Sequence, residues 1–288
     1  MGVVSDFIRR LTGRGTPPQE TTLRNPNPSQ QSDICPRVDV DARTLKLEKA
    51  INIAKNGFNI PEDMLNSFEE PTLAIKIATS IGVELSSGWI NDSVIHRVGG
   101  IMNIYNEMKK DATNQARAYN GKPENFIPSS SRIVSQMLKT SLKKQLDRKL
   151  EIDRNKEPYL NQVCNSALER LGQFPPNLAV REDYVLERAR ERGCMEITCE
   201  GDNANITKGE LKAAIRLAQF RHNGSVKEDD IRSLGGPAAV IQVMVAKAEY
   251  EALENKTELK FLQDSIPHYL GSPIDIIREM MHKKELGR

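Results

Sequence analysis

The sequence lacks long apolar runs, has few aromatic residues and carries almost no net charge. Its uninterrupted apolar stretches are only a few residues long, far below the roughly 20 needed to span a bilayer. Aromatic residues make up 5% of the chain and apolar residues 38%, which is low for a dense α/β enzyme. The formal net charge of +2 predicts no whole-molecule field that would attract nucleic acid or anionic lipid. Any electrostatic partner must therefore be recognised by a local patch.

Cysteine is also scarce. The four cysteines are scattered along the chain and form no disulfide framework, which is typical of a reducing compartment: Cys35, Cys164, Cys194 and Cys199. No charged-then-apolar leader with a cleavage site opens the sequence. We therefore expect a cytoplasmic protein, with a membrane surface or the interior of a viral particle as alternative places of work.

Catalytic signatures are missing as well. The chain contains no P-loop, no dinucleotide-binding glycine motif, no His-Glu-x-x-His and no nucleophile elbow. Its four histidines are spread over predicted helices, caps and turns. We therefore expect a protein that is not an enzyme, with no catalytic or metal-binding residues, no cofactor and no small-molecule substrate.

Two weak metal patterns have simpler explanations. Cys194, Cys199 and His222 offer three zinc ligands, but the four-residue gap and the missing fourth ligand favour a short hairpin with buried thiols. Residues 203–211 resemble the second half of an EF-hand loop. That loop would place Cys199 at its first ligand position and Ala204 where the sharp turn needs glycine, so an ordinary helix N-cap explains the segment better.

The N-terminal residues predict an arm on a linker. Residues 1–12 place apolar side chains at the i, i+3, i+4, i+7 spacing of one helical stripe, beside two arginines. Residues 13–39 hold five prolines among polar residues, which predicts a disordered or extended linker. The candidate contact residues of this arm, for a protein partner or a membrane, are Val3, Val4, Phe7, Ile8, Leu11, Arg9 and Arg10.

From Asp41 to Gly172 the pattern is helical almost without break. Gly57 predicts a helix end, and Pro61 and Pro71 each sit where a first helical turn accepts proline. Asn91 or Asp92 should cap a long helix that reaches to about Gly121. The predicted features that follow are a weak point or close packing site at Gly99 and Gly100, a long helix opened by Ser129–Ser131, a stop or restart at Pro158, and a helix from Tyr159 to Leu171.

The C-terminal half continues this pattern, with one exception. Thr207 with Glu210, and Ser225 with Glu228, have the spacing of capping boxes. A helix that starts at Pro237 is apolar on nearly every side, Val243 included, which predicts the centre of the C-terminal core. The remaining expected elements are a helix over Arg181–Arg192, a small β-hairpin near 194–199 and a last helix opened by Ser272 and Pro273.

Together these features predict an all-α protein. Its multi-helix body could divide into two helical subdomains, 40–172 and 177–288, with the boundary near Phe174–Pro176. At most one small hairpin interrupts the helical pattern.

One predicted helix carries a basic face. The candidate nucleic-acid-binding residues on it are Arg132, Lys139, Lys143, Lys144 and Arg148. Such a face could contact phosphates without reading sequence. The acidic residues between them favour equally a solvated helix face with intrahelical ion pairs.

We therefore hypothesise a non-enzymatic, self-assembling protein of nucleoprotein or viral structural type. In this hypothesis the chain is a homo-oligomer, the arm contacts a neighbouring subunit, and the basic helix faces RNA. The alternative is a peripheral membrane adaptor anchored by residues 1–12, whose body binds a protein partner. A third arrangement, in which the arm folds back on its own body, needs no partner.

Overall fold

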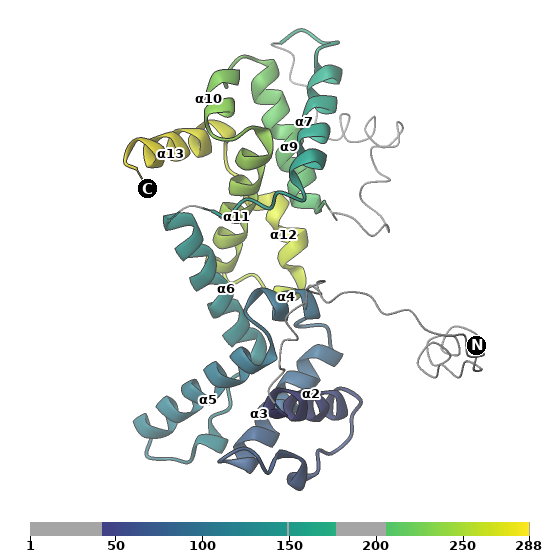
Figure 1. Cartoon of the computed structure of the whole chain (residues 1–288), viewed down its shortest axis with the longest axis vertical. Coiled ribbons are helices and arrows are strands. Elements are labelled where there is room, and N and C mark those ends of the chain that lie inside the picture. The colour runs from purple at the N-terminus through teal and green to yellow at the C-terminus, as the bar shows by residue number, and fades with distance from the viewer. Residues whose placement is uncertain (1–41, 149, 177–205, 288) are drawn as a thin grey trace, which may run out of the picture. The chain divides into compact units, whose positions relative to one another are not determined.

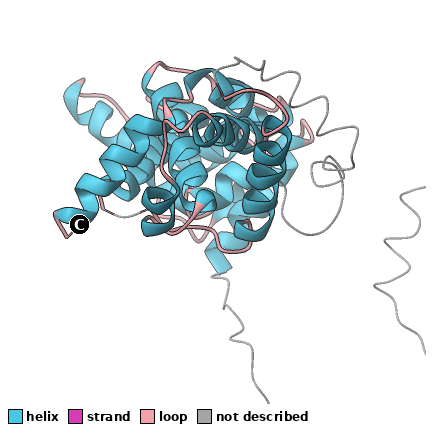
Figure 2. Ribbon diagram, turned by 90° about the horizontal axis from the view of Figure 1, so that it is seen from above, coloured by secondary structure: helices cyan, strands magenta, loops and turns pink. Residues whose placement is uncertain are grey.

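The computed structural model describes residues 42–148, 150–176 and 206–287, and all regular structure in these residues is helical (Figures 1 and 2). The prediction of an all-α, multi-helix body is therefore confirmed. The expected arm (1–12), linker (13–39), helix Arg181–Arg192 and hairpin (194–199) lie outside the described residues.

The described elements follow one another without a strand between them. They are α2 (Ala42–Lys55), the 3-10 turn η1 (Glu62–Leu65), α3 (Pro71–Ser86), α4 (Asp92–Arg97), α5 (Ile101–Ala118), η2 (Pro123–Asn125), α6 (Ser130–Asp147), α7 (Glu157–Leu171), α9 (Lys208–His222), α10 (Glu228–Ser233), α11 (Pro237–Glu254), η3 (Leu259–Phe261), α12 (Leu262–Tyr269) and α13 (Pro273–Glu285).

Local signals explain most of these boundaries. The Asn91 side chain accepts a hydrogen bond from the Val94 backbone N–H at 3.0 Å and starts α4. The single long helix predicted from Asn91 to Gly121 is wrong, because the chain breaks at Gly99 and Gly100 into α4 and α5. Gly100 has φ +89° and ψ 174°, a conformation open almost only to glycine, so no helix can continue through it.

One of the two predicted capping boxes forms. The Thr207 hydroxyl accepts from the Glu210 N–H, and the Glu210 carboxylate accepts from the Thr207 N–H at 2.7 Å. The box predicted at Ser225 is wrong, because α10 begins at Glu228 after Lys227. The Ser225 N–H instead donates to the Asn223 side chain, which closes a local turn before the helix.

The buried side chains form two clusters. The first comes mainly from α2, α3, α5 and α6, and the second mainly from α7, α9, α11 and α13. Helix α11 contributes to both, with Leu253 in the first cluster and Ile241 and Met244 in the second. This helix is therefore central, as its composition predicts. Val243 was expected to be inside but is only partly buried, since it faces outward beside the second cluster.

The same backbone path occurs twice in residues 42–287. Gly88, Gly99 and Gly100, all with positive φ, return as Gly224, Gly235 and Gly236, each 136 residues later (224 − 88). The same interval relates α4 to α10, α5 to α11 and η2 to η3. We call residues 71–126 the first repeat and residues 207–262 the second repeat.

Hydrogen bonds and burial follow the same interval. Gly100 N–H donates to the Ile95 carbonyl at 2.9 Å, and Gly236 N–H donates to the Ile231 carbonyl at 3.0 Å. Asn120 and Lys256, which follow α5 and α11, both have positive φ. Three identical pairs are buried in both repeats: Met108 and Met244, Ala112 and Ala248, Ala116 and Ala252. The two repeats therefore share local geometry and the pattern of core positions.

Candidate functional site

Two of the five basic residues predicted to contact nucleic acid are already paired. The Arg132 guanidinium lies 2.6 Å from the Asp111 carboxylate on α5, and the Lys139 ammonium lies 2.7 Å from Glu254 on α11. A hydrogen bond from Lys139 lowers the pKa of Glu254, as does one from Tyr250, with a smaller contribution from the charge of Lys143. Arg132 and Lys139 therefore tie α6 to its neighbours more than they offer charge to a ligand.

The other three basic residues gather at the carboxyl end of α6. Lys143, Lys144 and Arg148 are exposed, and none forms an ion pair with another described residue. They lie in the last turn and just beyond it, where unpaired helix carbonyls favour cations. This end of α6 is therefore the part of the predicted basic face with the most available positive charge.

Helix α13 meets α6 at this end. The Lys283 ammonium donates to the Leu146 carbonyl at 2.6 Å, which satisfies one of the free carbonyls of the last turn of α6. Lys283 also donates to Glu279 at 2.9 Å, and Lys247 donates to the same carboxylate at 2.7 Å. These hydrogen bonds, that from Lys247 first, lower the pKa of Glu279. Glu279 is therefore held as an anion between two lysines.

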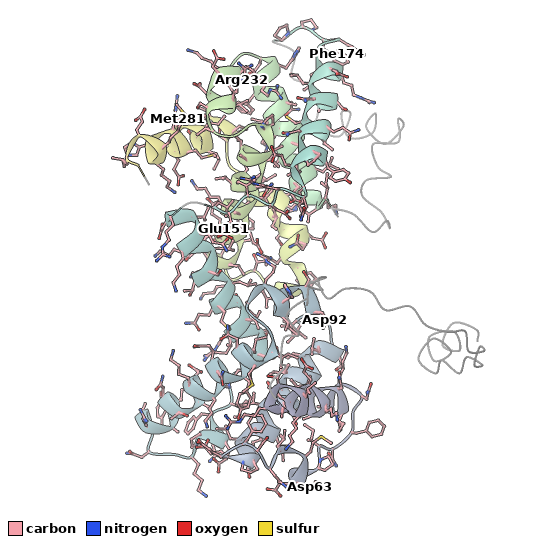
Figure 3. The ribbon with its side chains drawn as sticks, viewed as in Figure 1. Asp63, Asp92, Glu151, Phe174, Arg232 and Met281 are labelled. Atoms are coloured by element: carbon pink, nitrogen blue, oxygen red, sulfur yellow. The ribbon has the colours of Figure 1, made fainter. Side chains whose placement is uncertain are left out.

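A groove of about 440 Å³ lies between these elements. Its walls are α13 and the segment 146–152 after α6, which Glu151 marks in Figure 3, as Met281 marks α13. The apolar lining consists of Leu146, Leu150, Ile152, Leu234, Ala239, Val243 and Met280. The charged lining consists of Arg148, Lys283, Lys284 and Glu279, so cations outnumber the one carboxylate.

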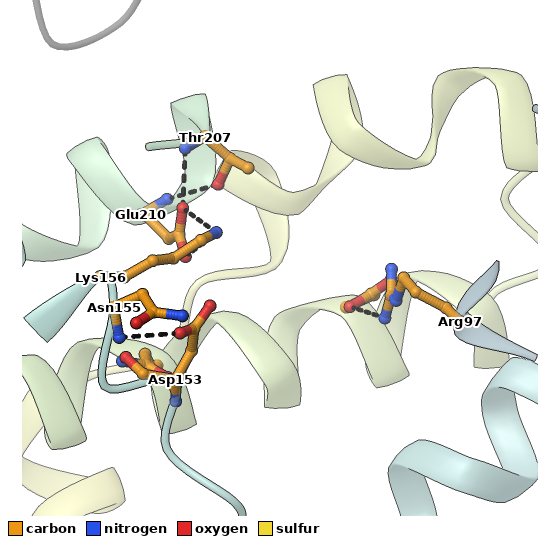
Figure 4. A network of polar contacts seen from close by, with 8 residues as sticks. Arg97, Asp153, Asn155, Lys156, Thr207 and Glu210 are labelled. Carbon is orange, nitrogen blue, oxygen red and sulfur yellow. Dashed lines mark hydrogen bonds and ion pairs between the residues drawn. The ribbon is translucent and has the colours of Figure 1, made fainter. Parts of the chain in front are cut away.

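The wall formed by the segment after α6 is held in place by a buried amide. The Gln242 side chain on α11 accepts from the Asp153 N–H at 2.7 Å and donates to the Asp153 carbonyl at 3.1 Å. Figure 4 shows Asp153 with Asn155 and Lys156, whose ammonium donates to Glu210 at 2.9 Å. These contacts fix the segment at both backbone groups of Asp153, so this wall of the groove is preformed.

The first repeat has a groove at the equivalent place, with different chemistry. Its volume is about 730 Å³, and it lies against α4, α5 and α6. The interval of 136 residues relates Asn103 to Ala239, Glu107 to Val243 and Lys144 to Met280, and each of these six residues lines its own groove. The groove of the first repeat is thus polar where that of the second repeat is apolar.

The residues considered for metals have other partners where they are described. Glu210 completes the capping box and binds Lys156, and a His222 ring nitrogen lies 3.1 Å from the Phe174 carbonyl oxygen. Burial raises the pKa of the Cys164 thiol, which makes it a weak nucleophile. Residues 42–148, 150–176 and 206–287 contain no group of three or more His, Cys, Asp or Glu that could hold a metal ion.

Sequence reasoning found Lys143, Lys144 and Arg148 but missed the groove beside Arg148. Val243 and Met280 looked like core positions, and Lys283 and Lys284 looked like ordinary cations at a helix end. The paired glycines Gly99–Gly100 and Gly235–Gly236 were a usable signal, because their equal surroundings reveal the repeat. The predicted contact residues of the arm, from Val3 to Leu11, lie outside the described residues.

Comparisons with known proteins add no identification. No family model, no curated protein and no solved structure matches this chain. None of the described helices is both long enough and apolar enough to cross a bilayer.

Proposed function

We propose that this chain is a non-enzymatic, self-assembling protein of the nucleoprotein or viral structural type that binds the RNA backbone through the carboxyl end of α6. The observation that carries the proposal is the group Lys143, Lys144 and Arg148, which is exposed and free of carboxylate partners among the described residues. Such cations can replace the counterions of a polyphosphate, which gives affinity without sequence preference. The protein would act in the cytoplasm or within a particle.

The experiment reverses these three charges in the full chain. Lys143→Glu, Lys144→Glu and Arg148→Glu together should reduce binding to single-stranded RNA of any sequence, measured by fluorescence anisotropy over a range of salt concentrations. The slope of log K against log salt should flatten by roughly 0.7 for each phosphate contact that is lost.

The matched control carries the same change in charge elsewhere. Lys208→Glu, Arg232→Glu and Arg278→Glu alter three cations that are each at least 75% exposed and lie away from α6. This control should keep most of the affinity and most of the salt slope. Equal losses in both variants, or no RNA binding by the unaltered chain, would contradict the proposal.

Assembly is assigned to the N-terminal arm, on the apolar stripe that includes Phe7 and Ile8. Changing both residues to Asp should lower the oligomer state measured by size-exclusion chromatography with light scattering, since each fully buried apolar side chain contributes about 1.5–3 kcal/mol. If the same change leaves the oligomer intact and abolishes binding to anionic liposomes, the arm is a membrane anchor and this part of the proposal is wrong.

A further inference from the structure

We propose that the apolar groove between α11, α13 and residues 146–152 is a docking site for an acidic amphipathic helix of a partner protein. This inference goes beyond RNA binding, because the occupant, the chemistry and most of the residues differ. It rests on the lining of the groove, its dimensions and its charge.

The groove presents a preformed apolar floor. Val243 and Ala239 of α11 form its base, and Met280 of α13 and Leu150 of the opposite wall flank it. The amide of Gln242 fixes one wall, and the bond from Lys283 to the Leu146 carbonyl joins that wall to α13. A groove held in this way loses little conformational freedom when a ligand binds.

The length of the groove suits two turns of helix. Its lining residues on α13 and beyond run from Glu279 to Gly287, which at 1.5 Å per residue is about 12 Å. A volume of about 440 Å³ is enough for roughly three apolar side chains. Docked amphipathic helices commonly use anchors at i, i+4 and i+7, which span the same length.

The rim selects an acidic occupant. Arg148 stands on one wall, and Lys283 and Lys284 stand on α13, where carbonyl oxygens of Leu146 and Ser233 hold their ammonium groups. Because these cations lie on both sides of the floor, a helix with carboxylates on both flanks can reach them all, whereas an amphiphile with one head group cannot. The chain's own arm carries Arg9, Arg10 and Arg14, so like charges oppose its docking here.

The first repeat provides the contrast. Its equivalent groove has Asn103, Glu107 and Lys144 where the second has Ala239, Val243 and Met280. The shared backbone therefore does not require an apolar surface at this place. Apolar floor and cationic rim occur together in only the second of these two grooves.

The test uses the full chain and a labelled helix-forming peptide of about 15 residues, with leucines at the i, i+4 and i+7 spacing and glutamates on both flanks. Fluorescence anisotropy should show binding. Two matched peptides, with lysines in place of the glutamates or serines in place of the leucines, should bind at least tenfold more weakly. Equal binding of the lysine peptide, or no binding of the acidic one, would overturn the proposal.

Variants locate the site. Val243→Asp on the floor should weaken peptide binding at least tenfold, and Lys284→Glu on the exposed rim should weaken it several-fold, with circular dichroism confirming that both variants are folded. Lys110→Glu, in the groove of the first repeat, should change nothing. Unchanged affinity in both groove variants would show that the peptide binds elsewhere.

Two further results separate this proposal from the others. Lys143→Glu with Lys144→Glu should reduce RNA binding and leave peptide binding intact, since neither residue lines this groove. A change of oligomer size in Val243→Asp would show that a second copy of the chain occupies the groove, and the partner-helix proposal would then be wrong.

Discussion

Glu249 is a buried charge that the fold satisfies with a single partner. Its carboxylate on α11 accepts two hydrogen bonds from the Arg97 guanidinium at the end of α4, at 2.6 and 2.9 Å. The Glu249 side chain is 7% exposed and that of Arg97 is 35% exposed. Such a two-pronged pair is specific in geometry as well as in charge, and it joins the first repeat to α11 of the second.

Arg97→Ala should lower the free energy of unfolding by about 2–3 kcal/mol, because it leaves a buried carboxylate unpaired. This value lies below that for fully buried pairs, since Arg97 is partly solvated. Arg97→Lys keeps the charge without the fork and should lose less. Urea unfolding measures both, and an unchanged midpoint for Arg97→Ala would show that water reaches Glu249.

Tyr105 predicts a dependence of stability on alkaline pH. Burial raises the pKa of Tyr105 from 10.0 to about 12, and the charge of Glu70 raises it further. Because the folded-state pKa lies above the unfolded value, the stability from this group is complete below pH 10 and is lost as pH rises from 10 towards 12. Tyr105→Phe should flatten the fall in urea midpoint over this window. An identical fall in both proteins would contradict the assignment.

At the scale of elements, sequence signals worked where the deciding interaction is local. Pro71, Pro237 and Pro273 begin α3, α11 and α13, because the first helical turn has no use for the missing N–H. The Ser225 signal failed because capping spacing states only what a side chain could bond. The Asn223 turn took the Ser225 N–H instead and shifted the helix start.

Helix α11 allows a matched comparison of two neighbouring apolar residues. Ile241 is completely buried, whereas Val243 lines the groove and is partly exposed. Ile241→Asp should cost more than about 4 kcal/mol or prevent folding, because its charge would be buried without a partner. Val243→Asp should cost about 1 kcal/mol, since its carboxylate can reach water. Thermal melts by circular dichroism compare the two, and equal losses would show that the groove is closed.

At the scale of the whole molecule, the two buried clusters depend on shared helices. Ala252, Leu253, Leu259 and Leu262, all from the second repeat, belong to the same cluster as α2, α3 and α5. The first cluster is therefore incomplete without residues that lie far along the chain. The predicted subdomain boundary between 172 and 177 stays a prediction, and the packing supplies a way to test it.

A fragment of residues 40–175 should not fold cooperatively, because it exposes the surface that these four residues cover. Residues 40–288 should show a single cooperative transition. Near-ultraviolet circular dichroism and thermal melting of both chains give the comparison, with the longer chain as the control. A cooperative melt of the fragment at a similar temperature would show that residues 40–172 are an independent domain.

The sequence by itself determined the helical class, most helix boundaries and the basic end of α6, because periodicity, caps and charge act over a few residues. It did not reveal which cations stay unpaired, since Asp111 and Glu254 reach Arg132 and Lys139 from other helices. Only the tertiary structure decided that Val243 and Met280 line a groove. Helix periodicity places an apolar residue on a face, but which neighbour covers that face depends on contacts between segments distant in the chain.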